Sequence, residues 1–268
     1  MPFARVIYDC IDDVAVHAPN PKVAPLVRQW EDRLLDKADA VVVTAEPLRD
    51  DIRSRRPSLP IALVRNGVDV DAFQTIAQTF PRPADVPSRG RPIIGFVGAL
   101  YEWIDWALIE RAAAEMPECE FVFVGPQRRN KTAQRLVRRA NVHFLGPRPY
   151  AEVPAYMQAF DVCWVPFDQS RVSRAANPVK IYEYLALGKP VVTTPVAGTE
   201  PAGDLVRVGT SSEEIIEHLQ ACLSDSEDLL ERRVKFARAN SWAVRAAQYV
   251  DFVQAITAAK DPTEARTQ

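Results

Sequence analysis

The sequence has little that would mark a secreted, metal-binding or nucleic-acid-binding protein. It contains only four cysteines in 268 residues, and none stands in a CxxC pair. These cysteines therefore indicate neither a zinc site nor a redox pair, and we expect reduced thiols. The formal net charge is −2, whereas a nucleic-acid-binding protein usually carries a basic face. We therefore expect no nucleic-acid partner.

Long apolar runs are also missing. No stretch approaches the roughly 20 residues that an apolar helix needs to cross a bilayer. The first residues, MPFARVIYDC, lack the apolar core of a secretion signal. A GxGxxG segment after a strand, which would indicate a dinucleotide-dependent oxidoreductase, is absent as well. These absences predict a soluble cytoplasmic protein and leave open a peripheral contact with the inner face of the membrane.

The chain does have a regular alternation of short apolar runs and amphipathic stretches. Alternation at this spacing predicts an α/β fold with a doubly wound parallel sheet. Sheets of this kind bind ligands outside the carboxyl ends of their strands, so we expect a nucleotide-bearing ligand there. Six runs carry the prediction from residue 91 onward: RPIIGFVG, EFVFVGP, NVHFLG, DVCWVPF, KPVVTTP and DLVRVG.

The first part of the chain predicts a smaller sheet. Only the stretches Ala4–Tyr8, Ala38–Thr44 and Ile61–Val64 read as strands there. Prolines without a clear period follow residue 74, and this pattern is typical of a linker. We predict a partial amino-terminal Rossmann-like domain over 1–75, a linker over 76–91, a complete Rossmann-like domain over 92–240 and a carboxyl-terminal helix over 241–260.

Three strand ends offer candidate ligand contacts. Gly98 and Ala99 follow the first of the six runs, and Gly125 follows the second. Glycine lets the backbone approach a ligand closely, and the amides after it can hold an anion. Arg148 is the one cation in the loop after the third run. The alternatives are tight turns at the glycines and a surface role for the arginine.

The fourth junction, NPVKIYEYLALGKPVV, carries the strongest signal. We predict that Pro178 lies in the first turn of a helix and that Asn177 caps it. A lysine in that turn, Lys180, opposes the helix dipole unless an anion such as a diphosphate lies nearby. Glu183 shares a helix face with Lys180 and can accept two hydroxyl hydrogen bonds, as from a ribose. The alternative is a surface salt bridge between the two side chains.

This junction resembles the donor-binding segment of the family 4 (group 1) glycosyltransferases. The resemblance implies the GT-B fold, in which two Rossmann-like domains face a cleft. The carboxyl-terminal domain then holds the nucleotide sugar, the amino-terminal domain holds the acceptor, and the last helix crosses back to the amino-terminal domain. Further blocks resemble the same family in order along the chain: WEDRLLDKADAVVVTAEPL, VRNGVDVDAF, GFVGALYEWIDWALI, EFVFVGP, NVHFLGPRPYAEVPAYMQAFDVCWVPF and NSWAVRAAQYV.

The resemblance also implies an activity. The chain is expected to move a sugar from a nucleotide diphosphate sugar to a glycan or lipid-linked acceptor, in polysaccharide or glycolipid assembly. Such enzymes retain the anomeric configuration, and we expect no metal and no cofactor besides the donor. Glu183 matches the acid that binds the donor ribose, Lys180 lies near the diphosphate, and Gly98 lies against the phosphates or sugar. Asp12 and Asp13 are the acceptor-side catalytic candidates, ahead of the nearby His17.

The chain departs from the family pattern in three ways. Ala175 stands where the first acid of an E-x7-E pair is usual, and Ala99 and Ile104 occupy the region of a common basic pair. The amino-terminal domain is also short by roughly 90–100 residues. This leaves two alternatives open: a non-catalytic relic that binds the donor, or a subunit that needs a second copy or a separately encoded amino-terminal half. A sugar-nucleotide epimerase of the same fold is a third alternative, which the few acids disfavour.

Overall fold

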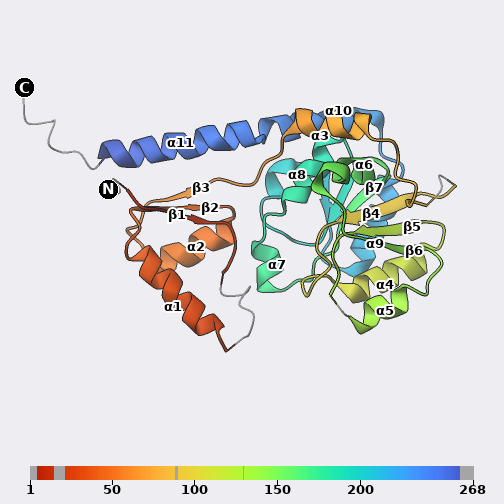
Figure 1. The fold of residues 1–268 in the computed structure, drawn as a ribbon, viewed down its shortest axis with the longest axis horizontal. Coiled ribbons are helices and arrows are strands. Elements are labelled where there is room, and N and C mark those ends of the chain that lie inside the picture. The colour runs from red at the N-terminus through yellow and green to blue at the C-terminus, as the bar shows by residue number, and fades with distance from the viewer. Residues whose placement is uncertain (1–4, 15–21, 88–89, 129, 260–268) are drawn as a thin grey trace, which may run out of the picture. The chain divides into compact units, whose positions relative to one another are not determined.

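This computed structural model describes residues 5–14, 22–87, 90–128 and 130–259. They form two β-sheets, and the strands within each sheet are parallel (Figure 1). Contacts divide the chain into two units that each hold one sheet. Unit 1 comprises Met1–Asn66, Ala175–Asn177 and Trp242–Gln268. Unit 2 comprises Gly67–Arg174 and Pro178–Ser241.

Unit 2 is built on six parallel strands in the order β6-β5-β4-β7-β8-β9. Numbered from its own first strand, this is the order 3-2-1-4-5-6 of a dinucleotide-binding Rossmann fold. The chain adds strands on one side of β4 and then crosses to β7 on its other side. The strands are β4 (Ile93–Val97), β5 (Glu120–Val124), β6 (Val142–Gly146), β7 (Val162–Val165), β8 (Val191–Thr193) and β9 (Val206–Val208).

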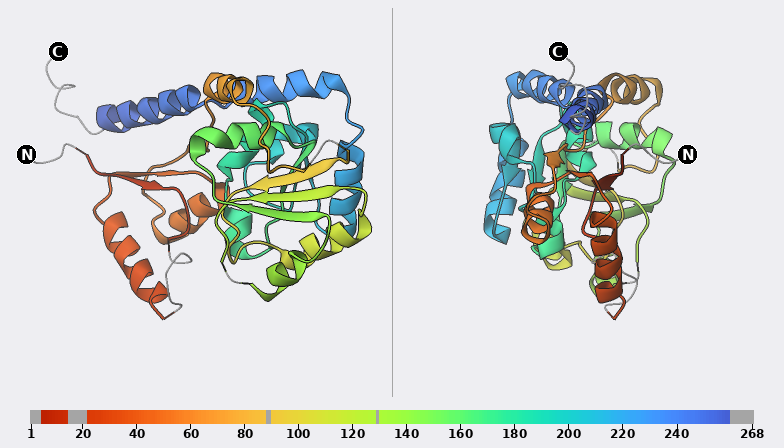
Figure 2. Two further views of the ribbon diagram at one scale, coloured as in Figure 1. Left: turned by 45° about the vertical axis from the view of Figure 1, so that its right-hand side comes forward. Right: turned by 90° about the vertical axis from the view of Figure 1, so that its left-hand side faces the viewer.

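Helices cover both faces of this sheet, as Figures 1 and 2 show. The first face carries α4 (Trp106–Glu115), α5 (Lys131–Leu136) and α9 (Ser212–Cys222). The other face carries α6 (Val153–Gln158), α8 (Val179–Ala186) and α10 (Glu227–Ala239), with α3 (Val70–Thr79) packed on α6 and α8. Shorter elements are η1 (Tyr150–Glu152), α7 (Arg171–Ala175) and η2 (Glu200–Leu205).

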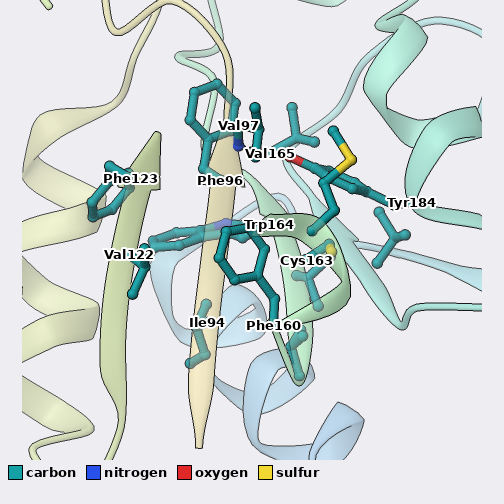
Figure 3. Packing of buried hydrophobic residues seen from close by; sticks show 14 of the residues in the cluster. Ile94, Phe96, Val97, Val122, Phe123, Phe160, Cys163, Trp164, Val165 and Tyr184 are labelled. Atoms are coloured by element: carbon teal, nitrogen blue, oxygen red, sulfur yellow. Dashed lines mark hydrogen bonds between the residues drawn. The ribbon is translucent and has the colours of Figure 1, made fainter. Parts of the chain in front are cut away.

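The core of unit 2 explains why the central strands read as continuous apolar runs. Every residue of β4, β5 and β7 is buried, because side chains on both faces meet helices. Phe121 and Trp164 meet edge to face with ring centroids 6.0 Å apart. Gly95 in β4 faces the ring of Phe160, which a methyl group at Gly95 would approach to 2.2 Å. Figure 3 shows Trp164 in this core, with Val122 and Phe160 nearby.

Unit 1 holds a smaller sheet of three parallel strands, β1 (Ile7–Cys10), β2 (Ala40–Val43) and β3 (Ile61–Leu63), in that order. α1 (Ala24–Leu35) and α2 (Glu46–Arg55) lie on one face, and α11 (Trp242–Ala259) lies on the other (Figures 1 and 2). Arg245 of α11 donates from Nε to the Asn66 carbonyl oxygen at 3.1 Å. Among the described residues, no helix is long and apolar enough to cross a membrane.

All four cysteines are buried free thiols. Cys10 belongs to unit 1, while Cys119, Cys163 and Cys222 belong to unit 2. Burial raises the pKa of the Cys10 thiol to about 11. The thiols are therefore protonated at neutral pH and serve as small core side chains.

The prediction of a linker over 76–91 was wrong in its first part. Residues up to Thr79 belong to α3, which begins after Asp69, whose carboxylate accepts a hydrogen bond from the Ala72 amide at 3.0 Å. Val70 and Phe73, each 4% exposed, anchor the helix in the core of unit 2. The prolines that suggested a linker all follow the end of this helix. Sequence reasoning also missed α7 and η2.

Candidate functional site

The candidate site lies beside β4, where the order in which strands are added to the sheet reverses. β4 pairs with β5 on one side and with β7 on the other, and parallel sheets bind ligands outside the carboxyl ends of strands at such a point. Gly98, Gly125 and Gly146 stand at or just after the ends of β4, β5 and β6. The Gly98 amide donates to the Val124 carbonyl oxygen at 2.8 Å, and the Gly125 amide donates to the Gly146 carbonyl oxygen at 2.9 Å. The edge is therefore lined by backbone.

Two of these glycines touch. A Cβ atom on Gly125 would lie 2.0 Å from the Gly98 carbonyl oxygen, which is backbone and cannot move aside cheaply. The φ angles of Gly98 and Gly125 are 151° and 146°, a region that other residues rarely adopt. Both predicted glycines thus have a structural reason for their identity.

Helix α8 is held against the end of β4 by a buried tyrosine. The Val97 amide donates to the Tyr184 hydroxyl oxygen at 2.9 Å, and the Tyr184 side chain is fully buried (Figure 3). Ile181 and Leu185 of the same helix are buried in the core. The first turn of α8 is consequently fixed beside the carboxyl edge of the sheet.

Lys180 extends from that first turn over Gly98. Its Cε atom lies 2.9 Å from the position that a Cβ atom on Gly98 would take. Its Nζ atom lies 5.5 Å from the centroid of the Phe96 ring and 5.2 Å from that of the Phe167 ring. The structure therefore brings Lys180 and Gly98 together from segments far apart in the sequence. A cation is held at the edge where an anionic ligand would meet backbone amides.

Glu183, one turn further along α8, is 5% exposed. The Tyr150 hydroxyl donates to its Oε1 atom at 2.8 Å. Burial raises the pKa of Glu183, while the hydrogen bond from Tyr150 and the charge of Lys180 oppose this shift. The carboxylate lies in a largely dry environment, where hydrogen bonds to hydroxyl groups are worth more than in water.

Asn177 does not cap α8 as predicted. The N-cap residue is Pro178, without a side-chain capping bond, so the proline stands one position before the helix instead of within its first turn. The Asn177 Oδ1 atom accepts a hydrogen bond from the Asn66 amide at 2.8 Å, and Asn66 Nδ2 donates to the Asn177 carbonyl oxygen at 2.6 Å. The side chain satisfies a backbone donor of unit 1, which outweighs capping.

Arg148 and Ala99 make contacts within unit 2. Arg148 forms an ion pair with Asp85 and donates from Nε to the Tyr156 hydroxyl at 2.6 Å. These contacts fasten the loop after β6. The Ala99 carbonyl oxygen accepts a hydrogen bond from the Trp103 indole at 3.2 Å, which shapes the loop after β4. That Arg148 or Ala99 contacts a nucleotide sugar stays a prediction.

The predicted acceptor-side acids lie in unit 1. Asp13 forms an ion pair of 3.2 Å with Arg28, which also contacts Glu31 at 2.8 Å and Asp51 at 3.1 Å. Asp12 accepts a hydrogen bond at its backbone oxygen from the Cys10 thiol, at 3.6 Å. His17 lies outside the described residues. The network gives Asp13 a structural partner whatever else it contacts.

A hollow of about 520 Å³ lies at the opposite, amino-terminal edge of the unit 2 sheet. Of its three cations, Lys189 donates to the carbonyl oxygens of Gln158 at 2.7 Å and Phe160 at 2.8 Å. Its acid Asp161 accepts from the Ile93 amide at 2.7 Å. These contacts hold strand starts in place, and parallel sheets generally bind ligands at the other, carboxyl edge.

Sequence reasoning missed Tyr150, Tyr184 and Phe73. Tyr150 lies in the PRPY loop beside Arg148, and Tyr184 lies among the apolar residues of its helix. Phe73 lies in α3, whose last residues overlap the predicted linker. Their partners are distant in sequence, so no local pattern points to them.

The sequence profile of the family described as "Glycosyl transferases group 1" matches residues 91–225. The chain therefore belongs to the group 1 glycosyltransferases. It is 29% identical over 256 residues to the teichuronic acid biosynthesis glycosyltransferase named TuaH of Bacillus subtilis, covering 89% of this chain and 64% of that protein. It is 26% identical over 249 residues to D-inositol 3-phosphate glycosyltransferase of Corynebacterium glutamicum, covering 82% and 58%. The chain thus spans less than two thirds of the length of these relatives.

Solved structures are similar in fold. Sucrose-phosphate synthase from Thermosynechococcus elongatus matches with a TM-score of 0.72 at 19% identity, over 95% of this chain and 68% of that one. HepE of Anabaena, in complex with UDP and glucose, matches with a TM-score of 0.71 at 18% identity, over 93% and 71%. Together with the strand order, these similarities confirm the predicted fold class: GT-B-like, with a complete carboxyl-terminal Rossmann-like domain and a partial amino-terminal one.

Proposed function

We propose that this chain binds a nucleotide diphosphate sugar at the carboxyl edge of β4 and moves its sugar to a glycan or lipid-linked acceptor. The observation that carries the proposal is the convergence of Lys180, Gly98 and Glu183 at that edge. A cation over a side-chain-free backbone suits a diphosphate, and a buried acid one helical turn on suits ribose hydroxyls. Membership of the group 1 glycosyltransferases supports the reaction class.

Lys180 and Glu183 carry opposite charges and are proposed to bind different parts of the donor. Lys180 and the amides after Gly98 stabilise the diphosphate, whose negative charge grows as the bond to the sugar breaks. Glu183 holds the ribose and so fixes where the diphosphate lies. We propose that the transfer retains the anomeric configuration and requires no metal ion. HepE was solved with UDP and glucose bound, and a donor of this chemical class is proposed here.

The acceptor side is assigned to unit 1. Asp12 and Asp13 remain the proposed acceptor-side groups, Asp13 with the structural contact to Arg28 described above. A lipid-linked acceptor would bring the protein to the inner face of the membrane, where we propose that it works.

We further propose that the chain acts with a second chain, either a copy of itself or a separately encoded amino-terminal half. β1 lies at one end of the three-stranded sheet. α1 exposes Leu26, Trp30 and Leu34 to 43%, 54% and 38%. These residues recur every four positions, so they lie on one side of the helix and form an apolar stripe. A donor-binding partner subunit without activity of its own is the alternative function that this stripe favours.

Calorimetry and a turnover assay separate these possibilities. UDP, GDP and their sugar conjugates are titrated into the chain with and without a chelator, and nucleotide release is then followed with and without glycan acceptors. Donor binding that survives chelation, together with nucleotide release, supports the enzyme. Binding without any turnover supports the partner-subunit alternative. Absence of binding by every nucleotide would refute both functions.

A further inference from the structure

We infer that Tyr150 is a positioning and specificity-determining residue for the nucleoside end of the donor. Its ring stacks on the nucleobase, and its hydroxyl sets the Glu183 carboxylate for the ribose. This inference rests on the proposed function and names a contact that neither the family resemblance nor the sequence pattern assigned.

The hydroxyl of Tyr150 reaches from the surface into the site. The side chain is 67% exposed, yet its hydroxyl donates to the buried Glu183 carboxylate at 2.8 Å. Burial of that hydroxyl and the nearby charge of Glu183 raise the pKa of Tyr150, so the phenol remains a donor at all ordinary pH values. One oxygen of Glu183 is thereby fixed, and the orientation of the whole carboxylate follows.

The ring of Tyr150 is held from behind. Phe73 of α3 meets it edge to face, with centroids 6.0 Å apart and an interplanar angle of 72°. Phe73 itself is 4% exposed, so one partner of this contact is anchored in the core of unit 2. The loop before Tyr150 is fastened by the Arg148 contacts to Asp85 and Tyr156. The ring is therefore placed before a ligand arrives, which lowers the entropic cost of binding.

The chemistry of a nucleoside makes this ring useful. The base and the hydroxyls that Glu183 would accept are substituents of the same five-membered sugar, so the base must lie close to the acid. An exposed aromatic ring hydrogen-bonded to that acid offers the base a flat apolar surface. Base–aromatic stacking is worth about tenfold or more in affinity and tolerates every base, because every base has a π-face. Tyr150 should thus select nucleoside diphosphates over plain pyrophosphate without choosing between uracil and guanine.

The test compares Tyr150→Ala and Tyr150→Phe in calorimetric titrations with UDP, 2′-deoxy-UDP and pyrophosphate. We expect Tyr150→Ala to weaken UDP by about 10- to 30-fold and to leave pyrophosphate within twofold. Tyr150→Phe keeps the ring and should weaken UDP by about three- to tenfold. That smaller loss should shrink for 2′-deoxy-UDP and disappear in a Glu183→Ala background, because the hydroxyl acts through the carboxylate.

Two controls keep the result specific. Tyr249→Ala changes a tyrosine of unit 1 and should leave UDP affinity unchanged. Tyr150→Trp keeps a stacking surface and should keep most of the affinity, which decides the question if Tyr150→Ala lowers the melting temperature.

The outcomes distinguish the two proposals. If Glu183→Ala weakens UDP while Tyr150→Ala stays within twofold of the native chain, the assignment of Tyr150 is wrong and the donor site stands. If Tyr150→Ala weakens pyrophosphate as much as UDP, Tyr150 is structural and the assignment is wrong. If the native chain binds no nucleotide, the proposed function and this inference fall together.

Discussion

Replacing Glu183 tests the proposed donor site most directly, because UDP affinity and stability can be measured separately on the same variant. The side chain is 5% exposed and receives the Tyr150 hydroxyl at 2.8 Å. A hydrogen bond to a charged group contributes about 1.5–3 kcal/mol, which corresponds to roughly 12- to 160-fold in Kd. We expect Glu183→Ala to lose affinity for UDP within this range. Glu183→Gln keeps one acceptor oxygen and should fall near its lower end.

Glu183→Gln should lower UDP affinity, but it should not lower the stability of the folded chain at neutral pH. Burial raises the pKa of Glu183, so the folded chain holds this proton more tightly than the unfolded chain does. Stability is then greatest below the unfolded pKa and declines as pH rises through the window up to the folded pKa. Glu183→Gln removes the ionisable group, so its melting temperature at neutral pH should equal or exceed that of the native chain. UDP affinity of the native chain should fall as pH drops through the same window, since a protonated carboxyl accepts fewer hydrogen bonds, and Glu183→Gln should show a flat profile.

Titration calorimetry over a pH series, paired with thermal unfolding of the same samples, measures both quantities. A Glu183→Gln chain that unfolds at lower temperature yet binds UDP with native affinity would refute this reasoning. Glu183 would then be a structural acid whose place near Lys180 has no connection with a ligand.

Three further predictions concern the glycine edge, the lysine and the apolar stripe. Lys180→Met should lower the affinity for both UDP and pyrophosphate by about tenfold. If calorimetry gives the variant the same affinities as the native chain, the diphosphate does not bind beside Lys180. Gly125→Ala should lower the free energy of unfolding by about 3 kcal/mol or more, because its Cβ would lie 2.0 Å from a carbonyl oxygen. Gly146→Ala is the control: its Cβ would meet nothing within 4 Å at a φ of 73°, so it should lower the free energy of unfolding by about 1 kcal/mol. If urea denaturation shows the same loss for Gly125→Ala as for Gly146→Ala, the close contact between Gly98 and Gly125 is wrong. Light scattering should show association that Leu26→Glu with Trp30→Glu abolishes, whereas a native monomer would show that the stripe needs no partner.

The strands of unit 2 could be predicted because their burial is visible in the sequence. A run such as IIGFV is apolar on both faces only if helices cover both faces, and β4 is buried throughout. The convergence of Gly98 and Lys180 also followed from sequence, since the carboxyl ends of adjacent parallel strands and the helix starts after them share one edge. Type and order of elements carried that prediction, and no exact boundary was needed.

What could not be predicted depends on contacts between distant residues. Tyr150 and Glu183 are 33 positions apart, and Asn66 and Asn177 are 111 apart. No spacing rule links such pairs. The Asn177 prediction failed because a local propensity for capping lost to a backbone donor in another part of the chain. α3 was missed in part because its anchor, Phe73, matters only once α6 and α8 are in place beside it.

The buried thiols are distributed so that cysteine labelling can report the opening of each unit in the native chain. Cys10 is the single cysteine of unit 1, and the other three lie in unit 2. A protonated thiol shielded from solvent reacts with an alkylating agent only when the structure around it opens. The rate at which each cysteine gains mass, followed by peptide mapping, therefore reports the opening of each unit separately. A donor nucleotide that binds unit 2 would slow labelling of Cys163 and leave Cys10 as an internal reference.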